Sequence, residues 1–215
     1  MAQKHGNIRR IKADVTSKSD LAAAAEQISK ESGYVNLVIA NSGITGPTLM
    51  GLSKDASITE FRDYLDSWDV EEYNKTYAVN TTAVFLTLVA FLELLDKGNK
   101  AGNVEQKSQF VSVASAGAFN RVPMAGFAYS GSKAATVHIT KQFATKLVQY
   151  DIRANVIAPG CKLSLLAFFT LLSDPYGSAN TDDTKCTLAR WAMCLPKGRM
   201  KSSRETSSPR KELEP

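Results

Sequence analysis

Residues 35–43, Val-Asn-Leu-Val-Ile-Ala-Asn-Ser-Gly, decide the fold. They begin with an almost uninterrupted apolar run, which ends at the polar turn of Asn41, Ser42 and Gly43. A short apolar run bounded by a turn is typical of a strand that is buried on both faces of a parallel sheet. We therefore expect residues 35–40 to form a central strand of such a sheet.

Similar apolar runs flank this strand along the chain and alternate with stretches of helical spacing. Further strands are expected at residues 8–13, 110–114 and 153–158. Helices are expected at residues 17–32, 58–65, 68–95 and 127–150, and a polar loop at 97–107. This alternation predicts βαβ units with right-handed crossovers. The expected fold class is therefore α/β, with a parallel sheet covered by helices on both faces.

The length and composition predict one globular domain. A chain of 215 residues with 44% hydrophobic content can bury a substantial core. We expect the domain to span residues 1–160, and residues 161–215 to be a divergent, basic and partly disordered segment. No window reaches the roughly 18 uncharged apolar residues of a membrane span, and no apolar stretch follows the first residues. The expectation is a soluble, cytoplasmic protein.

Charge and cysteine usage narrow the function classes. The net charge of +5 is modest, and the basic residues near the C-terminus have no interleaved aromatic residues and no amphipathic face. Neither nucleic acid nor a membrane surface is therefore an expected partner, although a basic nucleic-acid binder stays open as a minor alternative. The three cysteines, Cys161, Cys186 and Cys194, form no metal-binding pattern, so no metal is expected.

Candidate site residues follow the predicted strands, because ligands of open α/β sheets bind at the carboxyl ends of the strands. These residues are Asp14, the turn at 41–43, Ser115 (with Ser112 as a competitor) and the Pro159-Gly160 turn. Tyr129 and Lys133 lie four residues apart on one face of a predicted helix. An ammonium beside a phenol favours the phenolate, which makes a tyrosine usable as a general acid and base. An exposed surface pair is the alternative interpretation.

Taken together, these motifs resemble those of the classical short-chain dehydrogenase/reductase family. The resemblance covers roughly residues 8–160 and rests on five separated signatures. They are Asn41-Ser42-Gly43, Tyr77-Ala78-Val79-Asn80, Ser115, Tyr129-x-x-x-Lys133 and Asn155-x-x-x-Pro159-Gly160. The resemblance implies a Rossmann-like, doubly wound parallel sheet flanked by helices. It also implies an oxidoreductase that interconverts carbonyls and alcohols with NADP or NAD.

The resemblance also implies catalytic roles for four residues. Tyr129 would exchange the proton with the substrate oxygen, and Ser115 would hydrogen-bond that oxygen. Lys133 would activate Tyr129 and hold the nicotinamide ribose. Asn80, in a kinked part of the long helix, would anchor a water that connects Lys133 to solvent.

The cofactor-binding residues implied by the resemblance are Asp14, Asn41, Ser42, Gly43, Tyr129, Lys133, Pro159 and Gly160. Asp14 would meet the adenine ring, with a plain helix-preceding turn as the alternative. Asn41 would steady the central sheet and line the adenine side, and Ser42 stands where the family usually has alanine. The stretches around Tyr129 and residues 152–160 look most like members that act on 3-oxoacyl groups or secondary metabolites.

The sequence departs from the family in one important respect. A dinucleotide needs a glycine-rich turn after the first strand, and residues 14–17 contain none. By resemblance, the first two strands of the family are missing, which predicts an incomplete sheet of low stability. Residues 8–14 would either pair directly with residues 35–40 or remain unpaired. The apolar stretch 161–172 departs from the family as well.

Two classes of function are compatible with these observations. The first is an NAD(P)-dependent reductase with a small carbonyl or alcohol substrate, and by resemblance a homo-oligomer through its long helices. The second is a truncated, non-catalytic fragment that acts as an interaction partner of an intact homologue. The missing phosphate-binding turn is the feature that separates them.

Overall fold

The computed structural model describes residues 8–123 and 125–160. These residues belong to one compact unit. The domain boundary expected near residue 160, the basic segment 161–215 and its three cysteines all involve residues outside the described ranges. They remain predictions.

The described strands form a three-stranded parallel sheet in the order β1-β2-β3. These are β1 (Leu37–Ala40), β2 (Gln109–Val113) and β3 (Arg153–Ile157). Val38 pairs with Phe110, and Phe110 pairs with Ala154. The predicted α/β class with a parallel sheet is confirmed.

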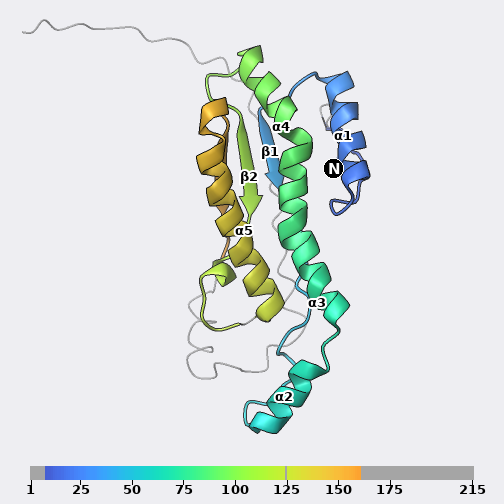
Figure 1. Ribbon diagram of the computed structural model, residues 1–215, viewed down its shortest axis with the longest axis vertical. Coiled ribbons are helices and arrows are strands. Elements are labelled where there is room, and N and C mark those ends of the chain that lie inside the picture. The colour runs from blue at the N-terminus through green and yellow to red at the C-terminus, as the bar shows by residue number, and fades with distance from the viewer. Residues whose placement is uncertain (1–7, 124, 161–215) are drawn as a thin grey trace, which may run out of the picture. The chain divides into compact units, whose positions relative to one another are not determined.

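Helices connect the strands (Figure 1). They are α1 (Lys18–Glu31), α2 (Ile58–Asp66), α3 (Val70–Tyr77), α4 (Ala83–Ala101) and α5 (Phe127–Lys146). Between α3 and α4 the chain continues through a π-helical segment, Ala78–Thr82, so residues 70–101 form one long helix. The short 3-10 helices Ala116–Ala118 and Val148–Tyr150 complete the described elements.

Local sequence explains where two of these helices begin. The Ser17 side chain accepts a hydrogen bond from the Asp20 backbone N–H, which satisfies a donor at the start of α1. At α2, Ser57 and Glu60 form a capping box. The helices expected at 17–32 and 58–65 are confirmed to within one residue at each end. The helix expected at 127–150 is confirmed as α5 followed by the 3-10 helix Val148–Tyr150.

The core lies between the sheet and the helices α4 and α5, which both pack on the strands (Figure 1). Its fully buried members include Phe110 and Leu95, with Val38, Val84 and Leu88 around them. Helix α1 packs against α4. This core holds the start of α5 near the ends of β2 and β3.

The expectation that residues 35–40 are buried on both faces is wrong. Val38 and Ala40 face the core, but Leu37 and Ile39 are each 46% exposed. Within the described ranges, β1 pairs only with β2, so it is an edge strand. Strand β2, by contrast, is central, and Phe110, Val111 and Ser112 are all buried.

The strand expected at residues 8–13 is also absent. These residues form no regular element, and most of them are exposed. A strand persists only where its backbone N–H and C=O groups have partners in a neighbouring strand. In the described part of the chain no strand pairs with residues 8–13, so the unpaired alternative is the one observed.

The polar loop expected at 97–107 begins later than predicted, because α4 continues to Ala101. Gly98 lies within this last part of α4 and is buried. A Cβ at this position would stand 2.2 Å from the Val35 backbone oxygen and 2.7 Å from Ser108 Oγ. The glycine therefore allows α4 to lie directly on the segments that lead into β1 and β2.

The long helix shares one property with membrane spans. Residues 70–101 contain an 18-residue window with mean hydropathy 1.9, of which 39% is buried, so by length and composition alone this helix could cross a membrane. Core helices of water-soluble proteins share these properties. In the structure this helix packs on α1, α5 and the sheet.

Candidate active site

The polar turns at the carboxyl ends of β2 and β3 meet directly. Ser115 follows β2 and begins the 3-10 helix, and the Pro159-Gly160 turn follows β3. The Ala116 N–H donates to the Pro159 carbonyl over 2.8 Å. A Cβ on Gly160 would stand 3.5 Å from that of Ala116. The two turns thus form one edge of the candidate site.

Tyr129 and Lys133 lie in the first turns of α5, on one face. Lys133 Nζ is 5.8 Å from the centre of the Tyr129 ring. Lys133 is only 3% exposed, and its Nζ donates to the Val113 carbonyl at the end of β2 over 2.8 Å. The ammonium is therefore held between the sheet and the tyrosine, and it is not a solvated surface charge.

Ser115 is placed beside Tyr129 by Gly117. The Ser115 hydroxyl accepts a hydrogen bond from the Gly117 N–H at 3.1 Å. A Cβ on Gly117 would lie 3.4 Å from Ser115 Oγ and 3.6 Å from Tyr129 Cε1. The competitor, Ser112, is fully buried and hydrogen-bonded to Thr140 Oγ1 at 2.7 Å. Ser115 is thus the serine that lies next to the tyrosine.

Asn80 lies in the π-helical segment and is fully buried. Its Oδ1 accepts from the Ile44 N–H at 2.8 Å, and its Nδ2 donates to the Ile44 carbonyl and to Ser132 Oγ, each at 2.9 Å. Its own backbone carbonyl accepts from Thr136 Oγ1 at 2.6 Å. Asn80 therefore ties the loop after β1 to α5.

Gly43 lets this loop approach the two polar side chains closely. A Cβ there would stand 3.1 Å from Lys133 Nζ and 3.2 Å from Asn80 Oδ1. The structure therefore brings together Gly43, Asn80, Ser115, Tyr129 and Lys133.

Ser132 and Thr136 were not among the residues expected from the sequence. Ser132 donates to the Tyr129 carbonyl at 2.8 Å, and the Ser132 carbonyl accepts from Thr81 Oγ1 at the same distance. These buried hydroxyls join α5 to the π-helical segment. A signal for them was present, since Ser132, Thr136 and Thr140 recur every four residues along one face of the helix.

Burial lowers the pKa of Lys133 below its ordinary value of 10.5, because desolvation penalises the ammonium. Between its folded-state pKa and 10.5 the unfolded chain binds more protons, so the contribution of Lys133 to stability rises with pH across that window. We expect the stability of the wild type relative to Lys133→Met to increase with pH as the pH approaches 10.5 from below, measured by urea unfolding at several pH values. The exposed Lys141→Met on the same helix is the control and should show no such slope; equal slopes would contradict the prediction.

Asp14 lies apart from this group. It is exposed, and its carboxylate accepts hydrogen bonds from the Thr16 N–H at 2.8 Å and the Thr16 hydroxyl at 2.7 Å. The backbone hydrogen bond from Thr16 is the main reason that the pKa of Asp14 is lowered. In this structure Asp14 is a turn residue before α1, and its predicted contact with adenine stays a prediction.

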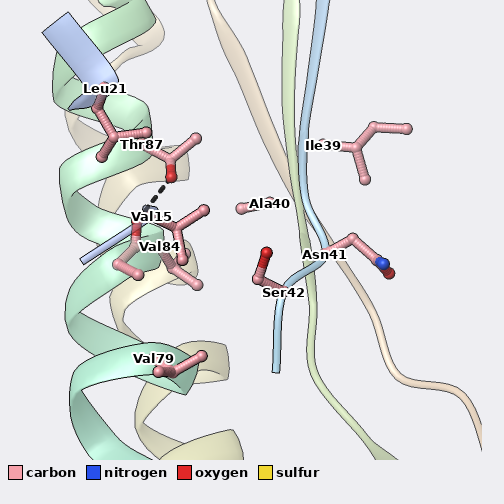
Figure 2. A pocket seen from close by; sticks show the side chains of 10 residues that line it. Val15, Leu21, Ile39, Ala40, Asn41, Ser42, Val79, Val84 and Thr87 are labelled. Carbon is pink, nitrogen blue, oxygen red and sulfur yellow. Dashed lines mark hydrogen bonds between the residues drawn. The ribbon is translucent and has the colours of Figure 1, made fainter. Parts of the chain in front are cut away.

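Asn41 and Ser42 border a shallow pocket of about 90 Å³ between β1, α4 and the start of α1. Figure 2 shows that Ala40 and Ser42 face α4, whereas Ile39 and Asn41 point away from it. Val15 and Leu21 close the far side of the pocket, and most of its lining is apolar. Ser115, Tyr129 and Lys133 do not line it, so it is separate from the candidate catalytic group.

The described residues thus place a buried Lys and a Ser hydroxyl beside a Tyr at the carboxyl end of a parallel sheet. The family model for short chain dehydrogenases matches residues 1–166. The chain belongs to the short-chain dehydrogenase/reductase family.

Individual relatives support this assignment. The chain is 47% identical over 157 residues to a short-chain dehydrogenase/reductase of Diaporthe leptostromiformis, an alignment that covers 73% of this chain and 54% of that protein. It is 43% identical over 190 residues to one of Stachybotrys chartarum, covering 81% and 70%. This chain thus spans about half the length of the Diaporthe relative.

Solved structures show the same fold. The complex of RhlG with NADP from Pseudomonas aeruginosa superposes with a TM-score of 0.60 at 22% identity, over 81% of this chain and 61% of that one. A 3-ketoacyl-ACP reductase from Sinorhizobium meliloti gives a TM-score of 0.55 at 28% identity, over 70% and 51%. The Rossmann-like class predicted from the sequence is confirmed.

Proposed function

We propose that this protein is an NAD(P)-dependent oxidoreductase that interconverts a carbonyl and an alcohol. The observation that carries the proposal is the convergence of Ser115, Tyr129 and Lys133, with Gly117 between the serine hydroxyl and the tyrosine ring. In this proposal Tyr129 donates a proton to the carbonyl oxygen during reduction and removes it during oxidation. Ser115 hydrogen-bonds the same oxygen and orients it.

In the same proposal Lys133 assists Tyr129 through its ammonium, which the Val113 carbonyl holds beside the tyrosine ring. Asn80 and Ser132 hold the first turn of α5 against the loop after β1, so they fix the position of this pair. The water that the family resemblance assigns to Asn80 is part of the same proposal.

The cofactor would supply the hydride. Tyr129 and Lys133 would hold its nicotinamide end, because Lys133 bonds the Val113 carbonyl at the end of β2, where the turn at Pro159-Gly160 meets Ala116. They do not fit its pyrophosphate, because α1 follows Asp14-Val15-Thr16-Ser17 and the described ranges contain no glycine-rich turn before a helix. Asn41 and Ser42, beside the pocket next to Val15, would line the adenine side.

The relatives support a choice of substrate class. One is named a rhamnolipids biosynthesis 3-oxoacyl-ACP reductase, and it is 24% identical over 187 residues. We propose a 3-oxoacyl group or a secondary metabolite as the substrate. The choice between NADP and NAD is left open, since the related structures include an NADP complex and an NAD+-bound xylitol dehydrogenase.

The test of the proposed function is cofactor binding and turnover by the full chain. NADPH and NADH are titrated by fluorescence, and the oxidation of each is followed at 340 nm with a panel of ketones. Binding at micromolar levels together with ketone-dependent oxidation supports the enzyme. Absence of both would overturn it and favour the non-catalytic fragment that pairs with an intact homologue.

We also propose that the protein self-associates through α4 and α5. Phe85 and Val89 on α4 are 45% and 55% exposed, and the Phe85 ring stacks on Phe143 of α5, with centroids 6.1 Å apart. Apolar side chains one turn apart on an outer helix face are suited to a helix–helix contact between two copies.

The expected result of Phe85→Lys is a weaker self-association, by at least tenfold in dissociation constant, because a charge replaces an apolar contact. Sedimentation velocity over a concentration series measures it. Val148→Lys, at a 68% exposed position beyond the end of α5, is the control and should leave association unchanged. A monomeric wild type would contradict the proposal.

A further inference from the structure

Large apolar side chains are exposed around the start of α5, next to the candidate catalytic group. Met50 is 71% exposed, Phe119 64%, Val122 57% and Phe127 40%. We call these four residues the apolar rim. Exposed aromatic side chains that gather at one place mark a binding surface more often than chance, because each one costs solubility.

Three segments bring the rim together. Phe119 caps the C-terminal end of the 3-10 helix Ala116–Ala118, and this helix packs on α5. The Gly126 N–H donates to the Pro123 carbonyl, which ties the segment after Val122 to the start of α5. A Cβ on Gly126, at φ +87°, would stand 2.1 Å from the Pro47 oxygen, so the loop leading to Met50 lies directly on the same point.

The rim is supported from behind by an aromatic cluster. The Trp68 ring lies 6.1 Å from that of Phe127, and the Tyr64 ring lies 6.3 Å from that of Trp68. The Tyr64 hydroxyl accepts from the Gly51 N–H and donates to the Thr48 carbonyl, each at 3.2 Å. These contacts fix the loop that carries Met50, so the rim is preorganised.

The charges near the rim select against an anionic ligand. Helix α2 and the residues around it, 54–72, contain seven acidic and two basic side chains, a net charge of 2 − 7 = −5. The acidic ones are Asp55, Glu60, Asp63, Asp66, Asp69, Glu71 and Glu72. Arg121, next to Val122, adds one positive charge. A phosphate-bearing carrier such as coenzyme A or an acyl carrier arm would meet repulsion here.

Resting on the proposed function, and choosing the secondary metabolite over a carrier-bound 3-oxoacyl group, we infer that the substrate is a neutral ketone or alcohol with an extended, ring-bearing apolar body that binds across the apolar rim. The reacting carbon then lies at Tyr129, whose ring adjoins Gly117 of the 3-10 helix that Phe119 caps, and the body of the molecule lies over Phe119 and Val122. The reaction is that of the proposed function: hydride is added to the carbonyl carbon, a proton to its oxygen, and NAD(P)H is oxidised.

Prodan, a neutral naphthyl ketone whose emission shifts to the blue in apolar surroundings, is the probe. Its binding to the full chain is titrated without cofactor. We expect saturable binding that weakens about tenfold in Phe119→Ala, because an aromatic contact is lost. The control, Val148→Ala, removes an apolar side chain that is equally exposed but lies beyond the other end of α5, and should bind like the wild type.

Acetoacetyl-coenzyme A is added as a competitor, and we expect no displacement of prodan. Displacement, the absence of saturable binding, or equal effects of Phe119→Ala and Val148→Ala would each overturn the inference. Reduction is then followed separately with NADPH. Binding at the rim without any cofactor-dependent reduction would retain the binding surface and reject the proposed function, so the two failures are distinguishable.

Discussion

Tyr129→Phe is expected to lower kcat by about 10²–10⁴-fold for any ketone that the protein reduces, the range typical of a lost general acid. The substitution removes only the hydroxyl that exchanges a proton with the substrate. The ring remains in contact with Lys133, and Ser132 still bonds the backbone carbonyl of residue 129, so the fold and the site geometry are retained. KM should change little. Steady-state kinetics with a saturating cofactor measure both parameters.

Tyr150→Phe is the matched control, because Tyr150 is 54% exposed and lies in the 3-10 helix beyond α5. It should leave kcat unchanged. If both variants lose activity to the same extent, or if Tyr129→Phe retains full turnover, Tyr129 is not the acid of the reaction. The reduction would then need a proton donor other than Tyr129.

Gly98→Ala is expected to reduce the free energy of unfolding by about 1–3 kcal/mol, although alanine is the better helix former. Propensity favours alanine by about 1 kcal/mol in a helix interior. A Cβ here would stand 2.2 Å from the Val35 backbone oxygen, and neither α4 nor the start of β1 can move away without disturbing the core. The steric cost therefore exceeds the gain. Urea unfolding followed by circular dichroism measures the difference.

The control for this prediction is Lys97→Ala, one residue earlier in the same turn and exposed. This substitution introduces alanine into the helix without a steric cost. Its free energy of unfolding should lie within about 0.5 kcal/mol of that of the wild type. A Gly98→Ala protein as stable as the wild type would mean that the contact with Val35 relaxes easily.

Local pattern was enough to predict the helices and the two strands 109–113 and 153–157. Each has a run or a spacing that is visible without knowledge of its neighbours. Strand 8–13 and the double-sided burial of residues 37–40 could not be predicted in this way. Both depend on partners elsewhere in the sheet, and in the described ranges Leu37 and Ile39 have no helix over them.

The candidate site shows the same division. Tyr129 and Lys133 follow from helical spacing, and Ser115 from its place after a strand. Sequence alone could not predict that Lys133 is buried and bonds the Val113 carbonyl. Nor could it predict the hydrogen bonds of the Ser132 and Thr136 hydroxyls. Both depend on the packing of α5 on the sheet and on the π-helical segment. The sequence offered Asn80 through resemblance alone, and the structure supplies its bonds to Ile44.

The π-helical segment at residues 78–82 has a consequence for the spacing of the chain. One additional residue in a helix rotates the turns before it by about 100° relative to the turns after it. That offset lets Tyr77 meet Gly131, where a Cβ would stand 2.2 Å from the Tyr77 hydroxyl, while Leu88 and Leu95 farther along still point into the core. The number of residues between Tyr77 and Leu88 is thus constrained as firmly as their identity.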